Sequence, residues 1–66
     1  MDNFRKAELM AKYMLENEYQ GDIAHFDREM GGLDQAVGQL FFWLEDGHCE
    51  DTVDIRQCVG YYFMLQ

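Results

Sequence analysis

The sequence predicts an all-α fold, a small compact bundle of three to four helices. Apolar residues recur at three- and four-residue intervals through most of the chain, which is the period of a helix with one buried face. The chain has no proline, and Gly21, Gly31 and Gly47 each follow such a segment, where a helix end favours a left-handed residue. These glycines divide the 66 residues into four segments. We expect the segments to form a single domain, residues 1–66.

The first segment, residues 3–19, shows the clearest helical period. Its apolar positions recur every three or four residues and should form one buried stripe. The residues on the stripe are Phe4, Ala7, Ala11 and Met14, widened by Met10 and Leu15. The segment therefore predicts a helix.

The second segment, residues 23–30, predicts a short helix. Asp22 precedes it as an N-cap, and Ile23, Phe26 and Met30 recur on one face. Gly31 follows as a C-terminal stop.

The third segment, residues 33–47, predicts another amphipathic helix. Gly38 lies inside it at a cost of about 1 kcal/mol relative to alanine, which indicates a close contact with another helix. The buried face should consist of Ala36, Val37, Leu40, Phe41 and Leu44, with Phe42 and Trp43 broadening the apolar arc.

The last segment, residues 52–66, fits two periods. Its odd positions alternate like a strand, while Ile55, Cys58, Val59, Tyr62 and Phe63 fit a helical face. No other segment reads as a strand partner, so we favour a helix capped by Asp51 or Thr52. The alternative is an α+β fold with an intermolecular C-terminal strand. In either case the apolar VGYYFMLQ end must dock on its own domain or on a second copy.

The charge of the chain is strongly negative. Thirteen acidic and five basic side chains give a net charge of −8, which disfavours direct binding of nucleic acid or of an anionic membrane. The N-terminal residues have no continuous apolar core, so we expect no signal peptide or membrane span and a cytoplasmic protein. Cys49 and Cys58 lie nine residues apart without a CxxC pair, and we expect them to remain reduced, with no disulfide. A positively charged partner is the natural complement.

The densest chemistry lies in EDGHCED, residues 45–51. Zinc sites need four ligands with CxxC- or HxxxH-type spacing, which this stretch lacks, so we expect no metal and no cofactor. A thiol nucleophile paired with His25 or His48 would need a pocket and an orienting group that the sequence does not supply. We therefore expect no enzymatic activity.

The carboxylates remain as candidates for contact with a partner. Several of them lie at predicted helix C-termini, where an anion costs about 0.3–1 kcal/mol, and breaches of local rules tend to fall at functional sites. Chance scatter of charge in an acidic chain is the alternative explanation. The candidates are Glu16, Glu18 and Asp22 around the first turn, and Glu45, Asp46, Glu50, Asp51 and Asp54 around the third.

Rows of such carboxylates can imitate a phosphate backbone, because side chains three or four apart on a helix have Cβ atoms about 5–6 Å apart. A Met-initiated acidic chain of 66 residues with the stretch EDGHCEDTVD and without proline resembles the small phage-encoded inhibitors of bacterial defence, the anti-CRISPR and anti-restriction proteins. The resemblance lies in the whole-chain profile and not in a family motif. It implies an inhibitor in the cytoplasm of a bacterial host cell, which blocks a basic nucleic-acid-binding protein or nuclease complex by mimicking DNA.

A second hypothesis belongs to another class. The apolar C-terminal segment could instead build a homodimeric helical interaction module or small regulator, in which Tyr62 and Phe63 hold two copies together. A monomer and a homodimer both remain open, and a dimer could also present a longer acidic face.

Overall fold

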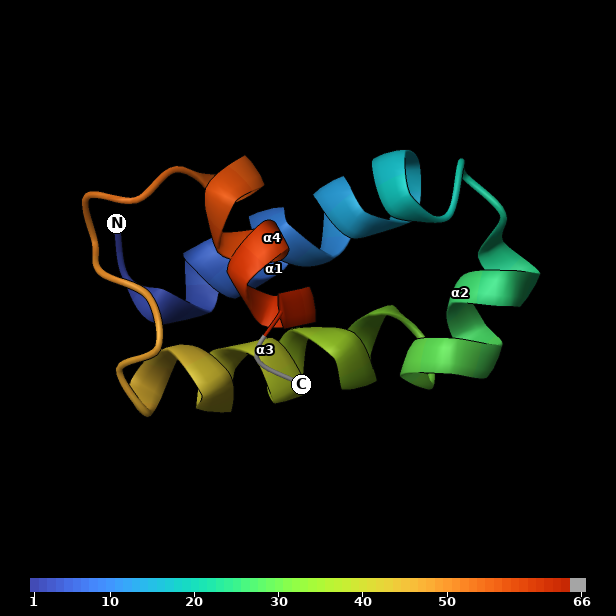
Figure 1. Ribbon diagram of the computed structural model, residues 1–66. Helices are drawn as coiled ribbons and strands as arrows, with labels where there is room; N and C mark the ends of the chain where they lie inside the picture. Colours follow the sequence, from blue (N-terminus) through green and yellow to red (C-terminus); the bar gives the residue numbers. More distant parts are fainter. Residues whose placement is uncertain (65–66) are drawn as a thin grey trace.

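Four α-helices make up the computed structural model, which describes residues 1–64 (Figure 1). Helix α1 spans Asn3–Tyr13 and continues into a π-helical turn, Met14–Glu18. Helices α2 (Ile23–Met30), α3 (Leu33–Glu45) and α4 (Ile55–Met64) follow. No strand occurs among residues 1–64, so the all-α prediction is confirmed and the C-terminal strand is wrong for residues 52–64. Residues 65–66 of the predicted fourth helix lie outside the described residues.

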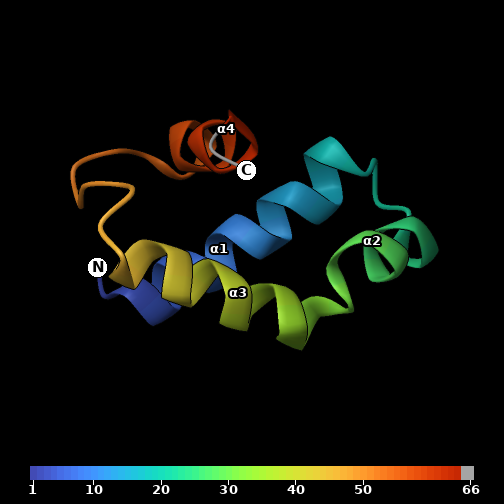
Figure 2. The same cartoon turned by 60° about the horizontal axis from the view of Figure 1, so that its bottom comes forward.

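Helix α1 is the centre of the bundle. It packs against α3 on one side and α4 on the other, while α2 closes the far end by packing on α3 (Figure 2). The approach is close because Ala7 and Ala11 of α1 are fully buried and carry small side chains. The other helices supply the rest of the core, namely Phe26, Met30, Ala36, Leu40, Leu44, Cys58, Val59 and Tyr62.

The π-helical turn explains how the end of the first helical segment continues the buried stripe. A regular helix would place residue 18 below Met14, and residue 18 is a glutamate. The turn instead closes with the Tyr19 amide donating to the Met14 carbonyl oxygen over 3.0 Å. This wider turn inserts one residue, so that Tyr19 is buried and Glu18 stays exposed.

Three residues that the helical period places on apolar faces are mostly exposed. Phe4 is 55% exposed, Ile23 is 63% exposed and Phe42 is 69% exposed, so their assignment to buried faces is wrong. Phe4 and Ile23 lie at the first turn of a helix, and Phe4 still meets Phe41 of α3 edge-on, with ring centroids 6.2 Å apart. The remaining stripe of α1 is confirmed, with Ala7, Met10, Ala11 and Met14 fully buried and Leu15 half-buried.

The helix ends agree with two of the predicted caps. The Asp22 side chain accepts a hydrogen bond from the His25 amide over 3.1 Å, and Gly31 ends α2 in the left-handed conformation, with φ 79°. At α4 the prediction is wrong, because the cap is neither Asp51 nor Thr52. Asp54 accepts from the Gln57 amide over 2.8 Å, since α4 begins only at Ile55.

Gly38 does not mark a close helix contact, contrary to the sequence prediction. A Cβ atom built at Gly38 would meet nothing within 4 Å outside its own helix. The glycine therefore costs α3 about 1 kcal/mol relative to alanine without any gain in packing against the described residues, 1–64.

The structure pairs Cys49 with Cys58 in a disulfide, so the expectation of two reduced thiols is wrong. The two Cα atoms are 6.1 Å apart, which suits a disulfide. The expectation relies on the redox state of the cytosol, whereas the pairing depends on the fold. The chain reverses at Gly47, with φ 83°, and returns along α4, where Cys58 is buried near the start of the helix.

Candidate partner-binding surface

Five of the eight candidate carboxylates gather in one stretch, residues 45–54, which we call the acidic loop. It runs from the last residue of α3 to the residue before α4, at one end of the molecule (Figure 1, left). The loop contains no lysine or arginine. Its exposed carboxylates are those of Glu45, Asp46, Glu50, Asp51 and Asp54.

Three consecutive residues of the acidic loop are each held by a different helix. The His48 ring stacks on Trp43 of α3, with ring centroids 5.4 Å apart and planes at 19°. Cys49 is joined to Cys58 of α4. The Glu50 carbonyl oxygen accepts a hydrogen bond from Lys6 Nζ of α1 over 2.8 Å. The backbone at the middle of the loop is therefore fixed to all three helices of the central bundle.

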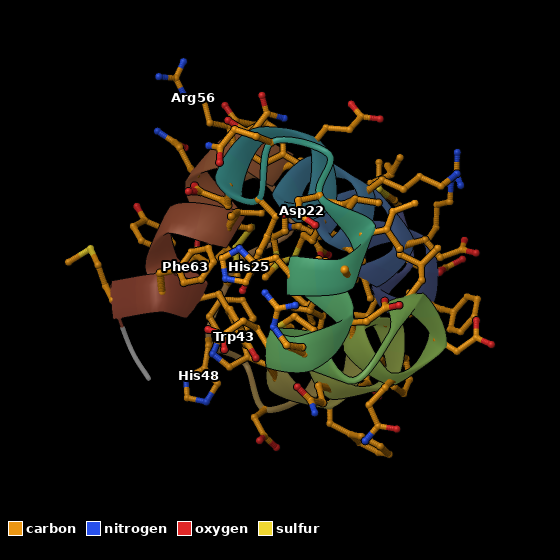
Figure 3. All side chains as sticks on the ribbon, turned by 90° about the vertical axis from the view of Figure 1, so that its right-hand side faces the viewer. Asp22, His25, Trp43, His48, Arg56 and Phe63 are labelled. Carbon is orange, nitrogen blue, oxygen red and sulfur yellow. A yellow bond between two sulfur atoms is a disulfide. The ribbon has the colours of Figure 1, made fainter. Side chains whose placement is uncertain are left out.

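Trp43 connects this end of the loop to the core. Its ring also meets Tyr62 of α4 edge-on, with centroids 5.3 Å apart. Figure 3 shows the Trp43 and His48 side chains next to one another, while Arg56 projects away from them. His48 is exposed, so the stack lies at the protein–water boundary.

The five carboxylates of the acidic loop differ in their own contacts. Glu45 accepts from Asn3 Nδ2 over 2.6 Å, and Asp54 caps α4. Asp46, Glu50 and Asp51 form no side-chain hydrogen bond, and within residues 1–64 the one ion pair joins Arg5 and Glu8. The negative charge of the loop is thus not neutralised by the protein itself.

The other three candidate residues lie elsewhere. Glu16 and Glu18 are exposed on the π-helical turn, and Asp22 caps α2. These residues lie at the end of the molecule opposite the acidic loop, and its longest dimension is 31 Å (Figure 1). The structure therefore separates the eight candidates into two surfaces.

The structure also bears on a metal site and a thiol nucleophile at EDGHCED. Within residues 1–64 no three His, Cys, Asp or Glu side chains are grouped so that they could hold a metal ion. Both thiols are consumed in the disulfide, so neither Cys49 nor Cys58 presents a nucleophile in this state. Over the same residues, no helix is both long enough and apolar enough to cross a membrane.

Tyr19, the residue after Glu18, has a shifted pKa. Burial raises the pKa of the Tyr19 phenol above its usual value of 10.0, and the charges of Glu29, Tyr62 and Glu18 raise it further. The Tyr19 ring lies edge-on to His25 and Phe26, at 4.9 and 5.3 Å between centroids. This environment disfavours the phenolate, so the tyrosine serves as a neutral part of the core.

Lys6 is the site residue that the sequence pattern does not identify. Only 3% of its surface is exposed, although lysine is one of the residue types least often buried. The available signal is its position four residues before Met10, at the edge of the buried stripe of α1.

No protein-family model, curated protein or solved structure matches the chain.

Proposed function

We propose that the protein is an inhibitor that blocks a positively charged nucleic-acid-binding surface by presenting the acidic loop in place of a phosphate backbone. The observation that carries the proposal is a loop with five exposed carboxylates and no internal cation, whose backbone is held at three consecutive residues. The target is a nucleoprotein or nuclease complex of a bacterial cell, as for the anti-CRISPR and anti-restriction proteins that the chain resembles.

The fixed backbone supports this function because a mimic must hold its charges where the target expects phosphates. Ordering a flexible loop at the moment of binding would cost free energy and weaken the complex. The contacts of His48, Cys49 and Glu50 remove most of that cost beforehand.

The charge of the loop supports the same function. DNA-binding surfaces gain affinity by neutralising phosphates, and such binding weakens steeply as salt rises. The side chains of Asp46, Glu50 and Asp51 form no ion pair within residues 1–64, so they can each meet a lysine or arginine of the target. Asp54 takes a lesser part, because its side chain already caps α4.

The proposal is tested by capture from a bacterial lysate. The immobilised protein is exposed to lysate at about 0.1 M salt and eluted at about 0.5 M, where charge interactions are screened over a much shorter distance. Mass spectrometry identifies the eluted proteins. We expect a nucleic-acid-binding protein whose capture is blocked by added DNA.

Two variants with equal net charge locate the contact. Reversing Glu45, Asp46, Glu50 and Asp51 to lysine changes the net charge from −8 to 0 and should abolish capture. Reversing Glu16, Glu18, Asp27 and Glu29 makes the same change at the other end of the molecule and should leave most capture intact. Equal loss in both variants would mean that only the overall charge matters. Full capture by the first variant would exclude the acidic loop as the contact.

A homodimeric interaction module is the second candidate, favoured by the exposure of α4. Tyr61 and Phe63 are each 42% exposed and Met64 is 80% exposed. Tyr62, in contrast, is buried against its own chain and meets Trp43, so it belongs to the fold. Sedimentation of the wild type and of a Phe63→Ser, Met64→Ser variant tests this candidate. A wild-type dimer that becomes monomeric in the variant would support it, and a wild-type monomer would exclude it.

A further inference from the structure

Gly38 lies in the middle of α3 with no structural reason for lacking a side chain. Its backbone is helical, and among residues 1–64 a Cβ atom there would meet no neighbouring group within 4 Å. Glycine lowers the stability of a helix interior relative to almost every other residue. Gly60 of α4 is likewise a helical glycine with open space around it, so what distinguishes Gly38 is the surface beside it.

An open hollow lies beside Gly38 on the surface of α3. The hollow has a volume of about 300 Å³. Beside it stands Phe42, which is 69% exposed although it is one of the largest apolar residues of the chain. We call this feature the α3 hollow, and its lining residues are Asp34, Gln35, Gly38, Gln39 and Phe42.

The α3 hollow lies in line with the start of the acidic loop. Gly38, Phe42 and Glu45 are spaced by four and then three residues, which places them on one face of the helix. The rise along that face from Gly38 to Glu45 is about 10 Å. One partner segment of a few helical turns can therefore reach both the hollow and the first carboxylates of the loop.

An aromatic ridge borders the same face. Phe42 meets Phe41 at 5.6 Å between ring centroids, and Phe41 meets Phe4 of α1 at 6.2 Å. Phe4 is itself 55% exposed. Exposed aromatic side chains beside a depression are typical of the anchor points that carry most of the energy of a protein interface.

The charge of this face determines which occupant suits it. Residues 33–46 contain Asp34, Glu45 and Asp46 but no lysine or arginine. A second copy would bring the same negative charge against itself, which opposes association. A cationic segment meets complementary charge at both ends of the hollow, with Asp34 at one end and Glu45 and Asp46 at the other.

We propose that the α3 hollow receives an apolar side chain from a cationic amphipathic helix of the partner protein, while lysine or arginine residues flanking that side chain meet Asp34 and Glu45. The acidic loop supplies charge attraction, which many basic proteins share. The hollow adds a shape requirement and so distinguishes one basic partner from another. The inference rests on the proposed function for the cationic character of the partner.

The probe is a synthetic helical peptide of about 14 residues, roughly four turns, with leucine along one face and lysine on either side. A control peptide has every leucine replaced by glutamine, so its charge is unchanged. Both are titrated into isotopically labelled protein, and amide chemical shifts are followed. We expect shifts at residues 34–42 with the leucine peptide, and weaker shifts, confined to the acidic loop, with the control.

Two matched variants test the hollow itself. Gly38→Gln fills it with a neutral side chain, and Gly60→Gln makes the same change in α4, where added atoms also meet open space. Both should keep or raise the thermal midpoint. Gly38→Gln should weaken the leucine peptide about tenfold or more, and Gly60→Gln should not change its affinity. Equal affinity of the two peptides, or of the two variants, would overturn the inference.

Two further outcomes would also contradict it. Shifts at residues 34–42 that appear on raising the protein concentration without peptide would assign the hollow to a second copy. Lysate capture that is unchanged by Gly38→Gln but lost on reversing the loop charges would remove the hollow and leave the proposed function standing.

If the leucine peptide binds at the hollow but capture does not depend on the loop charges, the proposed function fails and the hollow remains.

Discussion

Lys6 and Glu50 are 44 residues apart in the chain and are joined by a 2.8 Å hydrogen bond from the lysine Nζ to the glutamate carbonyl oxygen. The lysine is buried and the carboxylate of Glu50 stays exposed. A cation near the negative end of a backbone dipole thus holds the acidic loop without neutralising its charge. The backbone of Glu50 therefore positions the loop, and its side chain is left to present charge.

Replacing Lys6 with methionine should release the loop from α1. Methionine retains much of the buried chain of lysine but cannot donate to Glu50, and a hydrogen bond from a charged group contributes about 1.5–3 kcal/mol. We expect a loss of that order in the free energy of unfolding by urea, with faster amide exchange at residues 50–53. Lys12→Met, at an exposed position, is the control. Equal effects of the two changes would show that the hydrogen bond does not hold the loop.

Breaking the disulfide should lower stability without abolishing the helices. The bond closes a short ring between residues nine apart, and losing such a bond costs about 2–4 kcal/mol. Cys49→Ser is the appropriate variant, because Cys49 is only half-buried whereas Cys58 lies in the core. Circular dichroism during thermal unfolding, with and without a dithiol reductant, should show a lower midpoint for the variant and for the reduced wild type alike. An unchanged midpoint on reduction would contradict the role given to the bond.

Asp54 and Asp51 should differ sharply when each is replaced by alanine. Asp54 caps α4, and loss of an N-cap costs about 0.5–2 kcal/mol, whereas Asp51 makes no comparable contact. Urea unfolding should therefore show a clear loss for Asp54→Ala and almost none for Asp51→Ala. Asp54→Asn should retain most of the stability because asparagine also caps helices well. The reverse order would restore Asp51 as the cap.

Stability should fall at alkaline pH through Tyr19. Its pKa is raised in the folded state, so the unfolded chain releases this proton first as the pH rises. The contribution of Tyr19 is fully present below about pH 10 and is lost as the pH rises through the folded pKa. Unfolding by urea at about pH 9 and about pH 11 should show a smaller decrease for Tyr19→Phe than for the wild type. An identical decrease would mean that the other tyrosines account for it.

Sequence periodicity predicts the fold class because the strongest local signals agree with the tertiary packing. Asp22 and Gly31 delimit α2 as expected, since an N-cap and a left-handed glycine act within a few residues. Residues 55–64 become a helix, because α1 offers a helical face on which Cys58 and Val59 are buried. The helix period also predicts which residues lie on the same face of each helix.

Periodicity does not show how much of each helix face a neighbour covers, so it places Phe4, Ile23 and Phe42 in the core although they are exposed. It is also blind to contacts between distant parts of the chain. The disulfide and the hydrogen bond of Lys6 both depend on the path of the acidic loop, and no local signal encodes that path. The positions of the candidate carboxylates could be predicted individually, but not their separation into two surfaces.

The π-helical turn has a consequence for the loss of one residue from the chain. Removing one exposed residue such as Asn17 would bring Tyr19 to four places after Met14, which is the spacing of a regular helix. The same two side chains could then meet the core from an unbroken α1. Homologues that are one residue shorter at this point should share the fold, and an alignment that opens a gap there follows the architecture and does not signal divergence.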